Sequence, residues 1–208
     1  MLIKEINLSA CPNTGVILNG LNKQLFAEMN VIAPGKLLEI PAGGNVILGG
    51  GATPCFVGGP TARAKLLAAI AARDLPMTIN SAYRTVAQQF LLFRMHHFVP
   101  GSCGITAVAK PGTSNHESGL ALDIQEPMGW KPFLQPQGWR WFGPKDLPHY
   151  DFIGGTDLRS LAVKAFQSLW NKHNPGDQIT VDGLFFRGDG RQSETEKRLL
   201  NTPTDGFD

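Results

Sequence analysis

The apolar residues of this chain come in short runs that glycine and proline interrupt. The 208 residues include 24 glycines and 15 prolines, more than average usage predicts. The glycines follow no collagen-like period, and hydrophobic residues make up 42% of the chain, too many for a disordered protein. A chain of this length forms one domain, or one domain with a small appendage. We therefore expect a compact globule that is rich in loops.

The charge and hydropathy of the chain exclude two classes of partner. Lysine and arginine number 19 against 17 aspartates and glutamates, which leaves a formal net charge of +2 with no basic block. So small a balance does not predict nucleic-acid binding. No apolar run approaches the roughly 18 residues of a membrane span, and residues 1–20 hold no run of signal-peptide length. We expect a monomer without membrane insertion, whose export route the sequence does not show.

The three cysteines, Cys11, Cys55 and Cys103, have the spacing of neither a disulfide scaffold nor a zinc ribbon. Because their number is odd, at most one bridge can form within the chain. Cys55 and Cys103 both lie in loops rich in glycine and proline, which flank the same predicted strand and helix. If a bridge forms, we expect it between these two.

The secondary-structure patterns divide the chain near residue 156. Residues 1–60 predict irregular structure with short strands, since glycine pairs interrupt their apolar runs. After the boundary, apolar residues at helical spacing predict a long helix, and a last short helix begins at Ser193. We therefore predict a domain over 1–156 and a helical appendage over 157–208.

Helices and strands alternate in the middle of the chain. An Ala/Leu-rich helix begins at Thr61, and alternating apolar residues predict a strand at 77–83. A second helix follows Thr85, whose hydroxyl forms a capping-box pattern with the Gln88 side chain. This order of elements favours a fold that mixes helices with a sheet.

Two further strands are predicted to carry polar residues on one face. Alternation over 120–124 places Asp123 opposite the apolar side chains. In the strand at 149–152, His149 and Asp151 lie opposite the two aromatic residues, and Asp151 either orients a nearby imidazole or lies at a solvated edge. The loop before it holds three tryptophans that form either a groove wall or core packing: Trp130, Trp139 and Trp141.

Three residues have the types that a catalytic zinc site needs. His116, Asp123 and His149 offer two nitrogen donors and one oxygen donor, which leaves a fourth position for water. Asp146, three residues before the last histidine, is placed to take a proton from that water. The alternative for each residue alone is an ordinary hydrogen-bonded histidine or aspartate. The helical HExxH zinc motif is absent because position 120 is leucine.

Residues 60–153 resemble a known peptidase family through three motifs in order. The motifs are Ser81-x-Tyr83-Arg84, Ser114-x-His116-x-x-Gly119-x-Ala121-x-Asp123 and Asp146-x-x-His149. They resemble the zinc D-alanyl-D-alanine carboxypeptidases and L-alanyl-D-glutamate endopeptidases of the M15, or VanY-like, family. The resemblance implies an α+β fold of the Hedgehog/DD-peptidase type, with helices flanking an antiparallel sheet. It also implies that the substrate is the stem peptide of peptidoglycan.

The resemblance implies a role for each matching residue. His116, Asp123 and His149 bind one Zn²⁺ ion per chain, and Asp146 is the general base. Arg84 polarises the scissile carbonyl; its alternative is a structural arginine that caps the preceding turn. Four further residues are candidates for hydrogen bonds to the substrate: Ser81, Tyr83, Gln88 and Ser114.

The C-terminal segment shows a second resemblance. Residues 157–208 resemble the three-helix peptidoglycan-binding repeats that often accompany such enzymes, and they depart from that pattern by an insertion at 187–192. The alternative is a helical hairpin that only packs on the catalytic domain.

The predicted function is hydrolysis of a peptide bond beside a D-amino acid in the cell wall, in the periplasm or outside the cell. We expect a D-alanyl-D-alanine carboxypeptidase, with an L-alanyl-D-glutamate endopeptidase or endolysin as the alternative. A zinc-containing binding module without activity is a third candidate. The presence of Asp146 and Arg84 beside the three ligands argues against it.

Overall fold

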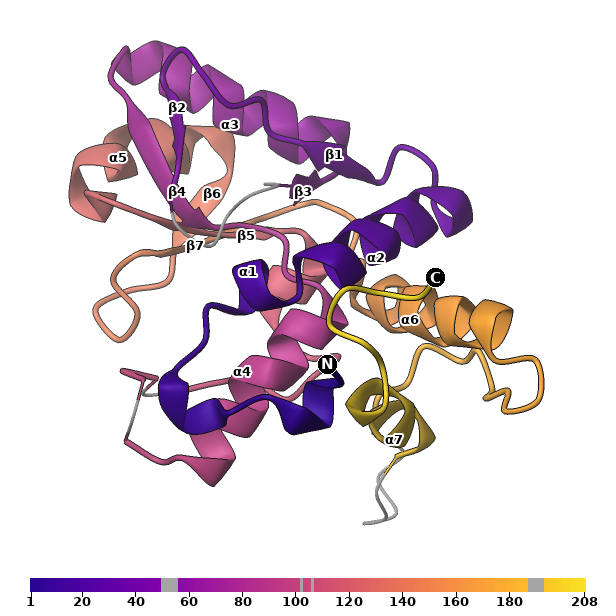
Figure 1. Ribbon diagram of the computed structural model, residues 1–208. Coiled ribbons are helices and arrows are strands. Elements are labelled where there is room, and N and C mark those ends of the chain that lie inside the picture. Colours follow the sequence, from indigo (N-terminus) through magenta and orange to yellow (C-terminus); the bar gives the residue numbers. More distant parts are fainter. Residues whose placement is uncertain (50–55, 102, 106, 187–192) are drawn as a thin grey trace.

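The computed structural model describes residues 1–49, 56–101, 103–105, 107–186 and 193–208 (Figure 1). Within these ranges the centre is a five-stranded sheet in the spatial order β2–β4–β5–β7–β6. Its strands are β2 (Val46–Leu48), β4 (Met77–Ser81), β5 (Ala121–Ile124), β7 (His149–Phe152) and β6 (Trp139–Trp141). A two-stranded sheet pairs β1 (Leu37–Glu39) with β3 (Phe56–Gly58).

The helices of the described ranges form two groups in Figure 1, with α3 and α5 beside the sheet and α2, α4, α6 and α7 below it. None of them is long and apolar enough to cross a membrane. The α-helices are α1 (Thr14–Ile17), α2 (Asn19–Ile32), α3 (Gly59–Arg73), α4 (Val86–Phe98), α5 (Pro127–Leu134), α6 (Arg159–His173) and α7 (Glu194–Leu200). The short 3-10 helices are η1 (Ile3–Glu5), η2 (Leu8–Ala10), η3 (Asn115–Ser118) and η4 (Gln135–Gln137).

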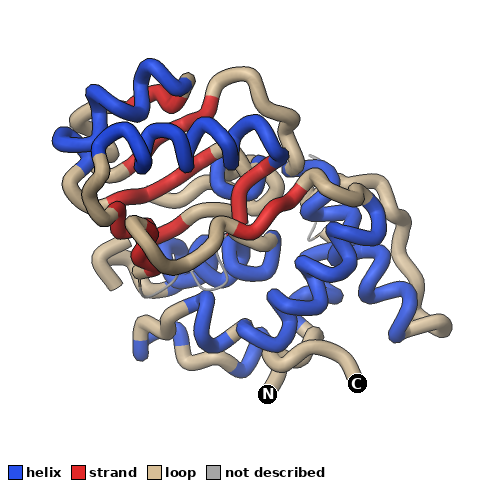
Figure 2. Tube along the Cα trace, turned by 90° about the horizontal axis from the view of Figure 1, so that it is seen from above, coloured by secondary structure: helices blue, strands red, loops and turns tan. Residues whose placement is uncertain are grey.

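One face of the sheet is apolar and packs beneath α3. Ile79, Leu122 and Tyr150 project from three adjacent strands into a fully buried cluster, which also contains Leu66 and Ile70 of α3. Figure 2, seen from above, places α3 in front of these strands. Because strand side chains alternate, this packing leaves the opposite face for polar residues.

The α+β class is confirmed, with one difference in the sheet. Strands β4, β5, β7 and β6 pair antiparallel as expected, but the edge strand β2 pairs parallel to β4. The helix α3 lies between these two strands in the sequence. A helical crossover of this kind permits a parallel pair, whereas a tight hairpin does not.

The N-terminal region is more helical than the expected irregular structure. The helix α2 runs through it, and its buried residues Leu21, Leu25 and Met29 recur every four residues on one face. The expectation was wrong because the glycine pairs belong to the later part of residues 1–60, where short strands do form. The helical spacing before them is local and was visible in the sequence.

A second core lies among the lower helices. Leu25 of α2, Phe90 of α4 and Phe166 of α6 are buried in one cluster. The Lys172 ammonium of α6 also pairs with the largely buried Glu28 carboxylate of α2. The helix after the predicted boundary therefore packs on the helices before it.

The two ends of the described chain meet beside this core. An isolated β-bridge joins Leu2 to Pro203, and the Ile3 N–H donates to the Thr202 carbonyl at 3.0 Å. Figure 1 shows both termini on the helical side of the molecule. The division into 1–156 and 157–208 stays a prediction.

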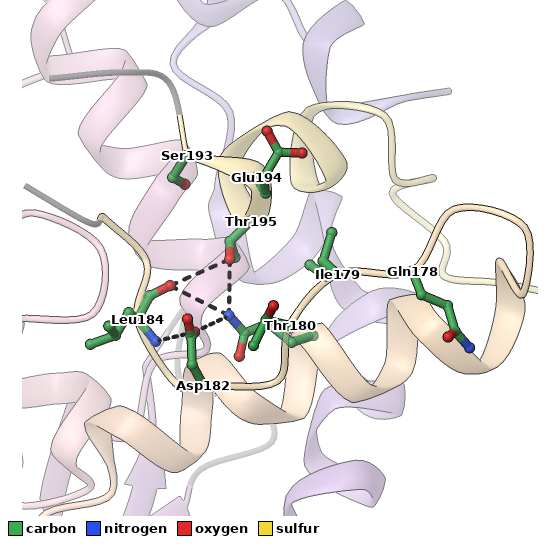
Figure 3. Close-up of a pocket in the computed structure, with 9 residues that line it drawn as sticks. Gln178, Ile179, Thr180, Asp182, Leu184, Ser193, Glu194 and Thr195 are labelled. Atoms are coloured by element: carbon green, nitrogen blue, oxygen red, sulfur yellow. Dashed lines mark hydrogen bonds between the residues drawn. The ribbon is translucent and has the colours of Figure 1, made fainter. Parts of the chain in front are cut away.

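A polar hollow of about 260 Å³ lies beside α6 and α7 (Figure 3). The Gln167 amide donates to Asp182 Oδ1 at 2.9 Å and to Thr195 Oγ1 at 3.0 Å. Its carbonyl oxygen accepts from the Gly183 N–H at 2.9 Å. These contacts tie the segment between the two helices to α6, so the polar groups of the hollow serve packing.

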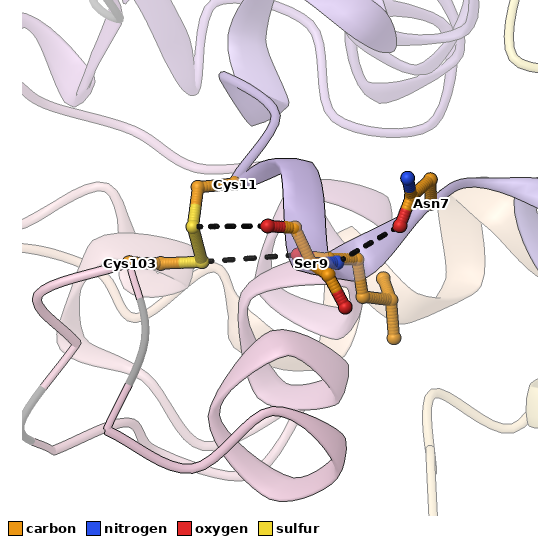
Figure 4. The surroundings of a disulfide bond; sticks show 5 residues. Asn7, Ser9, Cys11 and Cys103 are labelled. Atoms are coloured by element: carbon orange, nitrogen blue, oxygen red, sulfur yellow. Dashed lines mark hydrogen bonds between the residues drawn. A yellow bond between two sulfur atoms is a disulfide. The ribbon is translucent and has the colours of Figure 1, made fainter.

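The disulfide differs from the expected one. Cys11 is bonded to Cys103, with their Cα atoms 5.1 Å apart (Figure 4). The expected bridge from Cys55 to Cys103 is wrong because Cys103 already has this partner, and Cys55 lies outside the described residues. The bonded pair is separated by 92 positions and meets because η2 packs on α4. Sequence proximity could not reveal such a pair.

Candidate active site

Three neighbouring strands present polar side chains on the face of the sheet opposite its core. Ser81 on β4 is the register partner of Asp123 on β5, and Asp123 is the partner of His149 on β7. Their sequence neighbours Leu122 and Tyr150 are fully buried. Alternation places Asp123 and His149 opposite the core, and a register shift between Ile79 and Ser81 brings Ser81 into the same row. The alternation predicted for β5 and β7 is confirmed.

The turn η3 adds His116 to this row. Its N-cap residue is Ser114, whose hydroxyl oxygen accepts a hydrogen bond from the His116 N–H at 3.3 Å. It ends at Gly119, which has a φ of +76° and lies so close to β3 that a Cβ would stand 2.9 Å from the Gly58 Cα. The Arg84 N–H also donates to the His116 carbonyl at 3.1 Å. The Ser114 cap, the turn at Gly119 and the hydrogen bond from Arg84 together position the His116 imidazole.

Two imidazoles converge on one carboxylate. His116 Nε2 lies 3.2 Å from Asp123 Oδ2, and His149 Nδ1 lies 3.1 Å from Asp123 Oδ1. The two rings meet edge to face with centroids 5.0 Å apart. One donor atom from each residue falls within 4.8 Å of the others, a spacing that can hold a metal ion. The structure thus brings together the three residues predicted as ligands.

The far nitrogen of each ring has its own acceptor. His116 Nδ1 lies 2.8 Å from the Ala82 carbonyl oxygen, and His149 Nε2 lies 3.1 Å from Asp151 Oδ1. Asp151 is held in turn by the Asn115 side-chain amide, which donates to it at 2.9 Å. An N–H donated to these acceptors leaves the near nitrogen of each ring as the one that can exchange its proton for a metal ion. Asp151 therefore has the contact expected of a residue that orients an imidazole.

The cluster has an uneven charge distribution. Burial lowers the pKa of His116, and the nearby Arg84 guanidinium lowers it further. Burial alone would raise the pKa of Asp123, but the two adjacent imidazoles hold it well below its usual range. Burial also disfavours the charged form of His149, yet hydrogen bonds to Asp123 and Asp151 raise its pKa to about 9. The result is an ionised carboxylate between two imidazoles.

A groove of about 650 Å³ opens over this cluster. Arg84 lines one part of it, while Phe142, Lys145 and Asp146 line another from the loop between β6 and β7. The Phe142 ring lies edge to face with the His149 ring, at 5.2 Å between centroids. Phe142 and Lys145 were not predicted, although their closeness to Asp146 in the sequence was an available signal.

The two residues predicted to act beside the metal ligands both line the groove. Asp146 is half exposed, and its Oδ2 lies 3.9 Å from His149 Nδ1. The Arg84 side chain is partly buried, which lowers its pKa, and its guanidinium donates to Gln89 Oε1 at 2.8 Å and Ser81 Oγ at 3.3 Å. Arg84 thus contacts the preceding strand and also faces the groove.

The four predicted substrate-binding residues separate into two places. Ser114 lines the groove over the metal cluster. Ser81, Tyr83 and Gln88 line a neighbouring chamber instead. The Gln88 side chain accepts a hydrogen bond from the Thr85 N–H at 3.0 Å, so the predicted capping box is confirmed.

A buried glutamate that was not predicted holds the loop before η3. The Glu117 carboxylate accepts hydrogen bonds from the Gly112 N–H at 2.9 Å and the Ser114 N–H at 3.1 Å. Burial raises its pKa to about 7. The spacing Ser114-x-x-Glu117 is that of a capping box, which could have identified this contact.

A comparison with family models matches residues 60–153 to VanY, described as D-alanyl-D-alanine carboxypeptidase. These residues are similar to the VanY family over their whole length. The match contains all three clustered residues together with Arg84 and Asp146, and it supports the assignment to the M15 peptidases. A comparison with curated proteins finds no significant match.

The VanY-like domain supports a peptidoglycan hydrolase of the carboxypeptidase type, whose place of action is periplasmic or extracellular. The VanY-like family is generally zinc-dependent, in keeping with the clustered nitrogen and oxygen donors. Residues 157–208 lie outside the match, so the comparison does not support the repeat that they resemble.

Proposed function

We propose that this chain is a zinc-dependent D-alanyl-D-alanine carboxypeptidase acting on peptidoglycan stem peptides. One Zn²⁺ ion is held by His116 Nε2, His149 Nδ1 and a carboxylate oxygen of Asp123. The observation that carries the proposal is the pairing of both far ring nitrogens, with Ala82 at 2.8 Å and Asp151 at 3.1 Å. With the far nitrogens paired in this way, the near nitrogens are the ones that would give up a proton and bind the ion.

The donor set fits zinc. Two imidazole nitrogens and one carboxylate oxygen are a common catalytic set, which leaves one position open. Zinc, when bound, lowers the pKa of water toward about 7 and polarises a carbonyl.

Asp146 is the proposed general base. Its carboxylate lines the groove 3.9 Å from His149 and is half exposed, so water and substrate can both reach it. It takes a proton from the attacking water and delivers that proton to the nitrogen of the leaving D-alanine.

Arg84 is proposed to stabilise the negative oxygen that forms on the attacked carbonyl. Its fork is held by the Gln89 side chain at 2.8 Å, so little reorganisation is needed when charge develops. Ser114, at the groove wall, offers a hydroxyl to the peptide backbone.

Lys145 offers a cation to a carboxylate on the leaving residue. Among the described residues that line the groove, Lys145 and Arg84 are the cations, and Lys145 is exposed next to Asp146. A terminal carboxylate on the leaving residue needs a cation at this place. The D-glutamate of a stem peptide is joined through its γ-carboxyl and keeps a free α-carboxylate. Lys145 therefore suits either cleavage, and the carboxypeptidase assignment rests on the matched family.

The Cys11–Cys103 disulfide supports action outside the cytoplasm. Disulfides persist in oxidising spaces such as the periplasm and the cell exterior. These spaces are also where peptidoglycan is reached.

Digestion of purified peptidoglycan, followed by mass spectrometry of the fragments, tests the proposal. We expect loss of a single D-alanine from pentapeptide stems, and no loss after chelation of the metal. Fragments that begin with D-glutamate would replace the carboxypeptidase with the endopeptidase. Complete absence of hydrolysis by zinc-loaded protein would contradict a peptidase altogether.

A further inference from the structure

The groove continues past Arg84 into a second chamber of about 280 Å³. Arg84, Leu92 and Ile105 line both spaces, so the two are contiguous. The metal ligands and Asp146 line only the groove. A peptide that crosses the metal cluster can therefore extend toward the chamber along these three shared residues.

The outer wall of the chamber depends on the disulfide. Cys11 and Cys103 both line it, and their bond joins the N-terminal segment to the loop after α4. The adjoining Asn13 caps α1 by accepting from the Gly15 N–H at 3.0 Å. The His96 ring contacts the Ile105 carbonyl at 3.2 Å on the loop side. Each segment is thus anchored locally, and the disulfide sets the distance between them.

The lining of the chamber is chemically unlike that of the groove. Among the described residues that line the chamber, Arg84 is the only charged side chain. Amides and hydroxyls such as Asn80 and Thr14 lie beside apolar groups such as Leu92 and Met95. The groove, by contrast, carries two carboxylates. Neutral hydrogen-bonding groups mixed with apolar ones suit the backbone and apolar groups of a peptide.

The direction of the substrate follows from the position of Asp146. The leaving amine must lie beside Asp146, because this residue donates the proton to it. The acyl side of the scissile bond then runs the other way, toward Arg84 and the chamber.

We propose that the chamber is a substrate subsite for the backbone and apolar groups of the peptide segment on the acyl side of the scissile bond, and that the Cys11–Cys103 disulfide maintains its shape. This inference rests on the proposed function. It assigns a specificity-determining role to the N-terminal segment, which lies outside the matched residues 60–153.

The test uses acetylated peptides that end in D-Ala-D-Ala and are lengthened by one neutral residue at a time on the acyl side. For the full chain we expect kcat/KM to rise by about tenfold or more over the series, mainly through KM. Thr14→Trp fills the chamber from its N-terminal wall, and we expect it to remove this rise. Val31→Trp, at an exposed position of α2 that lines neither space, is the matched control and should retain it.

Removal of the disulfide tests the same subsite by loosening the chamber, whereas Thr14→Trp fills it. The double variant Cys11→Ser with Cys103→Ser loosens the wall, and we expect a weaker length dependence with unchanged zinc stoichiometry. If this variant does not fold, Thr14→Trp alone decides. A length dependence in Thr14→Trp equal to that of the unmodified chain would overturn the subsite.

Failure of the proposed function is distinguishable from failure of the subsite. If the zinc-loaded chain cleaves none of the peptides, calorimetric titration of the longest peptide into the chelated protein still measures binding at the chamber. Weaker binding by Thr14→Trp than by Val31→Trp would support the subsite without the activity. Equal binding, or no binding to either protein, would refute it.

Discussion

The two walls of the groove are built in different ways. One wall is the polar face of the sheet, where register sets Asp123 beside His149. The other wall and its adjoining chamber come from α4, the loop after it and the N-terminal segment, which the Cys11–Cys103 disulfide joins. The sheet wall depends on pairing between adjacent strands, and the helical wall depends on contacts between distant parts of the chain.

The two walls also differ in role, since one holds the residues proposed for catalysis and the other the proposed binding chamber. The sheet wall carries the metal ligands, whose geometry is set by a few backbone hydrogen bonds and two carboxylate contacts. The helical wall carries the second core and the chamber. We expect damage to the first wall to remove metal and activity, and damage to the second to change stability and substrate preference.

The largest effect is expected from His116→Ala. It removes the buried nitrogen donor that η3 adds to the sheet wall, so zinc binding and hydrolysis should both fall to background. Zinc content by elemental analysis and D-alanine release check this. His173→Ala is the matched control, because this ring stacks on Phe207 away from the groove. Full zinc content in His116→Ala would show that the ligand assignment is wrong.

The variant Asp146→Asn should still bind zinc but should hydrolyse the substrate much more slowly. Its carboxylate lies beside the cluster without contributing a converging donor atom, so zinc stoichiometry should not change. Loss of a general base typically lowers kcat by about 10²- to 10⁴-fold. Steady-state kinetics measure the effect, with the exposed Glu39→Gln as the control. An unchanged kcat would remove Asp146 from the mechanism.

Phe166→Ala should destabilise the helical wall. Truncation of a fully buried phenylalanine costs about 3–5 kcal/mol in free energy of unfolding. Denaturant unfolding measures this loss, and the folded fraction should still bind zinc with its original affinity. The matched variant Phe152→Ala, in the sheet core beside Asp151, should lower stability and zinc affinity together. If both variants changed zinc affinity equally, the metal site would depend on both walls and the proposed separation would be wrong.

Asp151→Ala should give the smallest effect. Loss of the acceptor for His149 Nε2 leaves the ring free to rotate, and such contacts are worth about 10- to 100-fold in metal affinity. Competition with a chelator of known affinity measures the change. Glu39→Ala removes an exposed carboxylate as the control. No change in affinity would assign Asp151 to the solvated edge instead.

Much of the sheet wall could be predicted because its signals are local. Alternation over a few residues is sufficient to place Asp123 and His149 opposite the core, and the burial of Leu122 and Tyr150 agrees with it. The capping box of Thr85 is likewise contained within four residues. The three tryptophans pack in or against the core of the sheet: Trp130 and Trp139 are buried, and Trp141 is partly buried against them. None of them lines the groove.

The helical wall could not be predicted in the same way. The Cys11–Cys103 bond and the shared core of α2, α4 and α6 join segments with no sequence relation to each other. The parallel pairing of β2 also depends on a crossover and not on the residues of the strand. Local patterns contain no information about such contacts, apart from the helical spacing of α2.

The alignment of Asp123 with His149 makes metal uptake a reporter of correct sheet assembly. Because strand side chains alternate, a slip of one position between β5 and β7 would bury the carboxylate and turn Leu122 outward. A sheet paired in the wrong register therefore lacks the carboxylate ligand of the metal site. Zinc binding in a library of core variants would select, without any assay of hydrolysis, those chains whose strands have paired in the native order.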